Sequence, residues 1–269
     1  MELQSLEVDA APAPAQVARS CLAACAMTDA EGYTGLAEGM APPQLAELVN
    51  RYFGELFAAV MGNHGVVIDV KGDGILAVWT SEAPGALLRA RVCAACLEIL
   101  DAAARFNDAS PGRGLPTRIG VDFGPIVLAN VGALERYEYR AIGDTVNTSS
   151  RLEELNKMLG TRLLVSETLA ERVEGFLFRD LGTFVLRGKR WPVRVLELVA
   201  ARSRASREQV LLCRRFSIAR DMYEAGRLDE ARLQFSALRA AFPHDGPTRF
   251  FLQRCFAGPS QRCAPLSLN

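Results

Sequence analysis

Several features that commonly reveal a protein's class are scarce in this sequence. It has two histidines, and its 31 lysines and arginines balance its 31 aspartates and glutamates, so no overall positive field draws it to nucleic acid or to an anionic membrane. No apolar run reaches the roughly 18–20 residues that a membrane span needs. Residues 1–20 carry acidic residues and prolines where a signal peptide has a basic start and an apolar centre. We therefore expect a cytoplasmic chain without a membrane span, with a flexible lead-in over residues 1–20.

The cysteines do not form an even set. Seven of them are present, which argues against a disulfide framework and for reduced thiols. Cys93 and Cys96 make a C-x-x-C, but inside RVCAACLEIL, which has a helical pattern. A redox or metal pair needs further ligands, and His64 and His244 are the only histidines available. We expect the pair to lie on the buried face of a helix.

The order of predicted elements indicates an α+β fold. The patterns predict a strand over 21–31, a helix from Pro42 to about residue 62 and a hairpin around the turn Gly72-Asp73-Gly74. A helix over 83–107, a strand pair with a glycine bend over 117–132 and a strand over 138–142 follow. Asp144 is typical of an N-cap for a helix to about Leu159, and strands continue to residue 200. This order predicts a ferredoxin-like βαββαβ core with extra strands.

Composition divides the chain into a main domain and a small helical appendage. The main domain is expected over 21–200, followed by a polar linker over 201–206, a helical segment over 207–257 and a flexible tail over 258–269. A single repeat cannot bury its own face, so the helical segment should pack on the main domain as a cap or bind a protein partner. Its residues have the spacing of one tetratricopeptide (TPR) repeat, at Ala219, Tyr223, Gly226, Ala231, Phe235 and Pro243.

Two aspartates stand at predicted strand ends. Asp29 lies in MTDAEGYTGLAE and Asp73 at the hairpin tip in VKGDGILAVW. If the two strands are neighbours, both carboxylates meet at one edge of the sheet and suit Mg²⁺, while backbone N–H groups over 32–34 could bind phosphates. Taken singly, Asp73 is also a common turn residue and Asp29 a common cap.

A third candidate is the helix in YRAIGDTVNTSSRLEELNK. Asn147 and Arg151 are four residues apart and project from one helix face, where an amide and a guanidinium could hold a ribose oxygen and a phosphoryl group. The alternative is a surface helix with an Arg–Glu ladder. No Ser/His/Asp or Cys/His set for nucleophilic catalysis is evident.

These motifs together resemble the class III adenylate and guanylate cyclases. The matching segments are MTDAEGYTGLAE, KGDGILAVW, GVDFGPIVLANVG and IGDTVNTSSRLEELN, in the family's order, and the resemblance runs from about residue 22 to 198. It implies an enzyme that converts ATP to 3′,5′-cyclic AMP and pyrophosphate. The segment from TRLLVS to DGPTRFFLQRC is most similar to bacterial sensor-linked adenylate cyclases, which favours ATP over GTP.

The resemblance also implies roles for individual residues. Two Mg²⁺ or Mn²⁺ ions per site would be held by Asp29, Asp73 and the Ala30 carbonyl. Asn147 would orient the ribose and Arg151 would stabilise the transition state. Phosphate contacts would come from Gly32, Tyr33 and Thr34, and from Arg187 or Lys189 in the turn LRGK. Family members place the aspartates and the Asn/Arg pair on opposite subunits, which implies a homodimer with two composite sites.

Two positions depart from the family pattern. Asp69 stands where the family has a purine-reading lysine, and Arg140 stands where its partner is usually Asp, Thr or Cys. Asp69 could accept from the adenine amine while Arg140 donates to N1, or the pair could read guanine, whose O6 and N7 suit arginine. Thirdly, the two could pair with each other and leave the base unread. The alternative functions are therefore a guanylate cyclase and a catalytically silent nucleotide-sensing homologue. A diguanylate cyclase is a minor alternative, because its hairpin would contain Gly-Gly-Asp-Glu.

Overall fold

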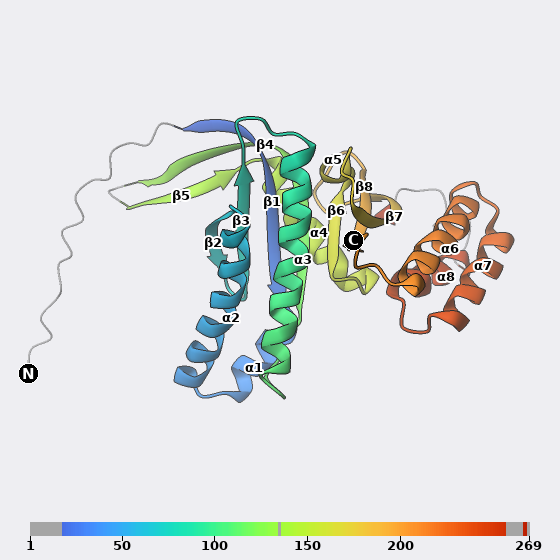
Figure 1. Cartoon of the computed structure of the whole chain (residues 1–269), viewed down its shortest axis with the longest axis horizontal. Coiled ribbons are helices and arrows are strands. Elements are labelled where there is room, and N and C mark those ends of the chain that lie inside the picture. The colour runs from blue at the N-terminus through green and yellow to red at the C-terminus, as the bar shows by residue number, and fades with distance from the viewer. Residues whose placement is uncertain (1–17, 134–135, 257–265, 268–269) are drawn as a thin grey trace, which may run out of the picture.

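The computed structural model describes residues 18–133, 136–256 and 266–267, and its centre is one twisted sheet (Figure 1). The strands are β1 (Arg19–Ala30), β2 (Val66–Lys71), β3 (Gly74–Thr80), β4 (Thr117–Ala133), β5 (Arg136–Ile142), β6 (Leu163–Ser166), β7 (Phe176–Val185), β8 (Val193–Ala201) and β9 (Leu266–Ser267). Within the described residues they form a nine-stranded sheet in the order β2-β3-β1-β4-β6-β8-β7-β9, and β5 pairs with β4. The β4–β5 hairpin extends from the body as an arm (Figure 1).

Helices cover both faces of this sheet. They are α1 (Tyr33–Gly39), α2 (Pro42–Gly62), α3 (Ala86–Asp108), α4 (Asp144–Leu159), α5 (Glu167–Ala170), α6 (Arg207–Glu224), α7 (Leu228–Ala241) and α8 (Gly246–Phe256). Because successive strand residues point to opposite faces, Ala24 and Ala26 of β1 pack under α2 and α3, whereas Ala23 and Cys25 belong to a second cluster with Val146 of α4. Thus α2 and α3 lie on one face and α4 on the other.

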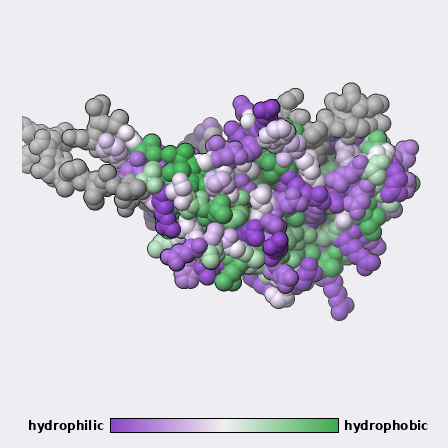
Figure 2. All heavy atoms as spheres, turned by 90° about the horizontal axis from the view of Figure 1, so that it is seen from above, coloured by the Kyte–Doolittle hydropathy of each residue, from purple (hydrophilic) through white to green (hydrophobic). Residues whose placement is uncertain are grey.

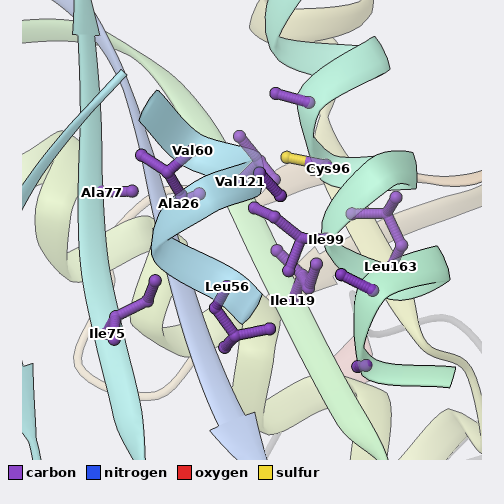
Figure 3. Close-up of a cluster of buried hydrophobic side chains, with 14 of the residues drawn as sticks. Ala26, Leu56, Val60, Ile75, Ala77, Cys96, Ile99, Ile119, Val121 and Leu163 are labelled. Atoms are coloured by element: carbon purple, nitrogen blue, oxygen red, sulfur yellow. The ribbon is translucent and has the colours of Figure 1, made fainter. Parts of the chain in front are cut away.

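The core between α2, α3 and the sheet is apolar and fully enclosed. Leu56 and Val60 of α2 meet Ile99 of α3 above Ile119 and Val121 of β4 (Figure 3). Cys96 also lies in this core, and with Cys93 it confirms the expectation of a buried helix face. Burial raises the pKa of the Cys93 thiol to about 12. Cys21, Cys25, Cys93, Cys96 and Cys213 are free thiols.

On the opposite face, α4 approaches the sheet closely at a glycine. A Cβ added to Gly120 of β4 would lie 2.1 Å from the Glu153 nitrogen and 2.2 Å from the Ser149 carbonyl oxygen. A larger residue would therefore push α4 away from β1 and β4. Asn156 of α4 completes the contact, donating to the Ile119 carbonyl at 3.0 Å.

Several local expectations were wrong. Residues 117–133 form one continuous strand instead of a strand pair, and a short helix over residues 33–39 was not predicted. Asp144 is the first residue of α4, the N-cap is Gly143, and no side chain caps this end. The Asp144 carboxylate instead contacts Lys189.

The ends of the chain also differ from the expected boundaries. Strand β1 already includes Arg19 and Ser20, and residues 266–267 of the expected tail pair with β7 in the sheet. The remaining parts of the predicted lead-in and tail, residues 1–17, 257–265 and 268–269, lie outside the described residues.

The C-terminal helices α6–α8 pack against the side of the domain that carries β7 and β8 (Figure 1). A capping box at Ser206 and Gln209 begins α6, because the Ser206 hydroxyl accepts from the Gln209 N–H at 3.1 Å and the Gln209 side chain accepts from the Ser206 N–H. Across the described ranges, no helix has the length and apolar character that crossing a membrane requires.

Candidate active site

The two candidate aspartates lie together where β1 and β3 meet. These strands pair antiparallel, with Met27 opposite Leu76, so the condition under which the two carboxylates meet at one edge is fulfilled. Gly74 makes this contact possible, since an added Cβ would lie 1.9 Å from the Thr28 carbonyl oxygen. The Thr28 hydroxyl accepts from the Ile75 N–H at 3.0 Å and holds the hairpin against β1. The carboxylates of β1 and of the β2–β3 turn therefore share one edge of the sheet.

A pocket of about 220 Å³ opens at this edge. It brings together Asp29, Asp73 and Asn147 from three separate segments of the chain. Its full lining is Met27, Thr28, Asp29, Lys71, Asp73, Val146, Asn147, Ser150 and Glu153.

Of the acidic side chains in this pocket, Asp29 has positively charged partners, whereas Asp73 and Glu153 are influenced mainly by burial and by Asp29. Asp29 forms ion pairs with Arg118 at 3.2 Å and with Lys157 at 3.3 Å. Burial and the nearby Asp29 carboxylate raise the pKa of Asp73 above its usual value, although backbone N–H groups act in the opposite direction. The same two causes raise the pKa of Glu153 to about 7. Glu153 is 5% exposed, and its Oε1 has no hydrogen-bond partner within the described residues.

The donor set of this edge fits a divalent cation that keeps part of its water and phosphate shell. Asp29 and Asp73 are hard oxygen ligands, and their mutual repulsion is the kind that a cation between them relieves. Across the described residues, no group of three or more His, Cys, Asp or Glu side chains is arranged to hold a metal ion. Two carboxylates with open positions match Mg²⁺, which is usually held by one or two carboxylates plus substrate phosphates.

The other predicted residues are placed as follows. Ala30 ends β1 next to Asp29, Gly32 has a left-handed φ of 83° at the N-cap of α1, and Tyr33 and Thr34 begin that helix. Arg151 does not line the pocket, and its guanidinium donates to Glu154 at 2.6 Å.

The two basic residues of the β7–β8 turn differ. Lys189 donates to the Thr148 hydroxyl at 2.8 Å and contacts Asp144, so it rests on the first turns of α4. It lines a second pocket of about 340 Å³ with Asp122 and Arg194. Arg187 is exposed on the same turn.

The base-reading candidates contact each other within one chain. Arg140 of β5 donates to Asp69 of β2 at 2.6 Å, and it also contacts Glu138. This contact matches the third alternative given for the pair, in which Asp69 and Arg140 bind each other and leave the base unread.

Sequence reasoning missed several residues of the site, above all Glu153 in the pocket and Lys157, which lies outside its lining and pairs with Asp29. A helical signal was available, because Val146, Ser150, Glu153 and Lys157 follow one face of α4. Arg118 carried no local signal, since only strand pairing places it opposite Asp29.

Comparison with known proteins identifies the family. The model of the adenylate and guanylate cyclase catalytic domain matches residues 19–198. This match covers more than half of the chain, which therefore belongs to the family of adenylate and guanylate cyclase catalytic domains, the class III nucleotide cyclases.

Among curated proteins, the chain is similar to adenylate cyclase 1 of Rhizobium meliloti (34% identity over 177 residues) and to an adenylate cyclase of Anabaena cylindrica (30% over 183 residues). Each match covers 64% of this chain but only 26% and 36% of those proteins. The chain thus spans about a quarter to a third of the length of these relatives.

Solved structures show the same fold. The crystal structure of the adenylyl cyclase CyaB from P. aeruginosa has a TM-score of 0.59 at 22% identity, covering 70% of this chain and 99% of that one. The guanylyl cyclase Cya2 has a TM-score of 0.61 at 23% identity, covering 70% and 96%. The expected α+β cyclase fold is confirmed.

Proposed function

We propose that this protein is an adenylate cyclase that converts ATP to 3′,5′-cyclic AMP and pyrophosphate. The observation that carries the proposal is the shared edge of β1 and the β2–β3 turn, where Asp29 and Asp73 line one pocket, in a chain of the cyclase family. ATP is favoured over GTP because the two curated relatives described above are named adenylate cyclases.

In the proposed reaction, the ribose 3′-oxygen attacks the α-phosphorus in line, and the bond to the pyrophosphate oxygen breaks. Divalent ions held by Asp29, Asp73 and the Ala30 carbonyl would lower the pKa of the 3′-hydroxyl and neutralise charge on the phosphate oxygens. Because nucleophile and electrophile belong to one molecule, the chain mainly imposes a near-attack geometry.

The remaining residues bind and orient the nucleotide. Asn147 would hold the ribose, and Arg151 would donate to the phosphoryl oxygens as their charge grows. Release of Arg151 from Glu154 would free its guanidinium for this contact. Lys189 or Arg187 would bind the triphosphate, together with backbone N–H groups at Gly32–Thr34.

We also propose that the active form is a homodimer with two composite sites. A pocket of about 220 Å³ is smaller than the ~300–1,000 Å³ of ordinary ligand sites, so one chain offers only part of a nucleotide site. Figure 2 shows hydrophobic side chains exposed at the end of the molecule that carries the arm. The exposed apolar residues on or beside β4 and β5 include Leu22, Val131, Tyr137, Tyr139 and Ile142. A second copy covering this surface would add its own Asn147, Arg151 and Lys189 to the site.

The base would be read by Asp69 and Arg140 once their mutual contact opens. Asp69 would accept from the adenine N6 amine, and Arg140 would donate to N1. The second candidate substrate is GTP, and the same pair supports it because arginine donors also match guanine O6 and N7.

The direct test is to incubate the protein with ATP or GTP and Mn²⁺ or Mg²⁺, and to measure cyclic product by chromatography. We expect cyclic AMP to form faster. Product from GTP alone would overturn the substrate assignment, and product from neither, in a confirmed dimer, would indicate the silent nucleotide-sensing homologue.

The dimer is tested by mixing two inactive chains. An Asp73→Ala chain lacks a metal ligand, and an Arg151→Ala chain lacks the transition-state donor. Mixed dimers would contain one intact composite site, so we expect activity to return in the mixture. Absence of any rescue would contradict the composite arrangement.

A further inference from the structure

The C-terminal helices touch the end of the helix that carries the proposed catalytic residues. Gly246, the first residue of α8, lies against the C-terminus of α4, where an added Cβ would be 2.1 Å from the Leu159 carbonyl oxygen. Gly160, which ends α4 with a left-handed φ of 68°, would place its own Cβ 3.3 Å from the Gly246 Cα. Backbone meets backbone here, and neither glycine can be enlarged without moving one of the helices.

The same helices share a hydrophobic core with α4. Leu152, Leu155 and Leu159 of α4 are almost completely buried in a cluster that continues into β6–β8 and α6–α8. A closely packed core transmits small displacements from one element to the next instead of absorbing them. From the C-terminal helices the cluster includes Phe216, Ala219, Ala231, Phe235, Leu238, Phe251 and Cys255.

A buried ion-pair group fixes the start of α8 relative to the sheet. Arg179 of β7 donates to Asp245 at 2.7 Å and to Glu197 of β8 at 2.7 Å. Its guanidinium also lies 5.0 Å from the centre of the Phe216 ring of α6. The second oxygen of Asp245 accepts from the Thr248 N–H at 2.9 Å, so the residue before Gly246 is held from both sides.

A second chain of contacts reaches the opposite end of α4. Arg220 of α6 pairs with Asp180 of β7 at 2.5 Å, and Asp180 also accepts from Arg194 of β8 at 3.0 Å. The turn between these two strands carries Lys189, which donates to Thr148 near the start of α4. The C-terminal helices therefore reach α4 directly at its end and through the β7–β8 hairpin at its beginning.

We propose that α6–α8 form a positioning unit that sets where α4 presents Asn147 and Arg151 to the reacting nucleotide. This inference rests on the proposed cyclase function and makes Gly246, Asp245 and Arg179 positioning residues for it. Misplacing a catalytic group by about 1 Å can cost on the order of 100-fold in rate. A shift of α4 should therefore lower kcat while leaving KM for the nucleotide largely unchanged.

The test uses the mixed dimer of Asp73→Ala and Arg151→Ala chains, in which each chain contributes one half of the single working site. The Asp73→Ala chain supplies α4 to the single working site and is named the α4 donor. The Arg151→Ala chain supplies the metal aspartates and is named the aspartate donor. Gly246→Ala is introduced into one chain at a time, and kcat and KM are measured for both mixtures.

We expect Gly246→Ala to lower kcat by about 10-fold to 100-fold in the α4 donor and much less in the aspartate donor. A merely structural role would not depend on which chain carries the change. The matched control is Gly54→Ala, since Gly54 lies in α2 with no atom within 4 Å of an added Cβ. It should leave both mixtures unchanged.

Each outcome decides between the models. Equal losses in the two mixtures, or no loss in either, would overturn the positioning role. If the Gly246→Ala chain does not form mixed dimers, Asp245→Asn replaces it and is judged by the same asymmetry, because this change removes one charge from the Arg179 group and keeps an acceptor for Thr248. Failure of the parent mixture to regain activity would instead refute the composite site, and the inference would fall with it.

Discussion

The pocket and the junction with α6–α8 both enclose acidic side chains, and the pKa values of these side chains shift for different reasons. In the pocket, Asp73 and Glu153 are enclosed near Asp29 and their pKa values are raised, first by burial and then by Asp29. At the junction with α6–α8, each buried acid faces an arginine. Burial of Asp180 is outweighed by hydrogen bonds from Arg220 and Arg194, which keep the pKa of its carboxyl below the usual value.

This is the difference expected between the proposed active site and a structural contact. Carboxylates that lack partners are costly in the folded chain unless a cation joins them, which is what a metal-dependent site requires. At the junction, arginines of the same chain supply the positive charge that the acidic side chains need. Even there, burial raises the pKa of Glu197, so pairing offsets only part of the cost of enclosing a charge.

The largest expected effect comes from removing a pocket carboxylate. Asp73→Asn should lower kcat by about 1,000-fold, since the lost charge stabilisation is worth several kcal/mol. The melting temperature without metal should stay the same or rise, because Asp29 no longer faces a second charge. Chromatography of the cyclic product measures the loss of kcat, and thermal unfolding measures the melting temperature.

Asp108→Asn is the matched control, because Asp108 is an exposed aspartate at the end of α3. It should change neither property. A stable Asp73→Asn enzyme with normal kcat would remove the pocket from the mechanism.

The next effect concerns stability at the junction. Arg179→Met leaves Glu197 and Asp245 buried without their shared partner, so the free energy of unfolding should fall by about 3–5 kcal/mol. Urea unfolding monitored by circular dichroism measures this loss. In contrast, Asp229→Asn breaks a surface pair with Arg232 in which Asp229 is 95% exposed, and it should cost about 0.5 kcal/mol or less. Similar losses for the two variants would show that the junction pairs are no stronger than surface ones.

The smallest effect is a change in pH dependence. Because the pKa of Glu153 is raised from its ordinary 4.5 to about 7, the folded state binds more protons than the unfolded state between these values. Glu153 therefore contributes stability that is fully present below pH 4.5, is lost as the pH rises to about 7, and stays lost above it.

The Glu153→Gln variant has no titrating group at this position, so its stability should lack this pH-dependent contribution. Melting temperatures are compared between pH 4.5 and 8 in the presence of a chelator. The melting temperature of the parent relative to that of the variant should fall by a few degrees as the pH rises, since 1 kcal/mol of stability corresponds to about 2–4 °C. A constant difference across this range would contradict the raised pKa.

Much of the fold and the site could be predicted from local patterns. The predicted strand over 21–31 and the Gly-Asp-Gly turn place Asp29 and Asp73 at strand ends, and the four-residue spacing of Asn147 and Arg151 places them on one helix face. Local patterns failed where tertiary contacts decided the outcome. Strand β4 is continuous because residues 117–128 pair with β1 and residues 127–133 pair with β5, and Asp144 contacts Lys189 instead of capping α4.

Local periodicity and turn chemistry were enough to predict the order of most elements. The resemblance of four motifs to the class III cyclases indicated the family and the four candidate residues, Asp29, Asp73, Asn147 and Arg151. The tertiary structure alone decided which side chains share a space. It placed Glu153 beside Asp29, paired Asp69 with Arg140, and set Gly246 against the end of α4. Residues far apart in the chain meet only through strand pairing and close packing, and no local pattern records those contacts.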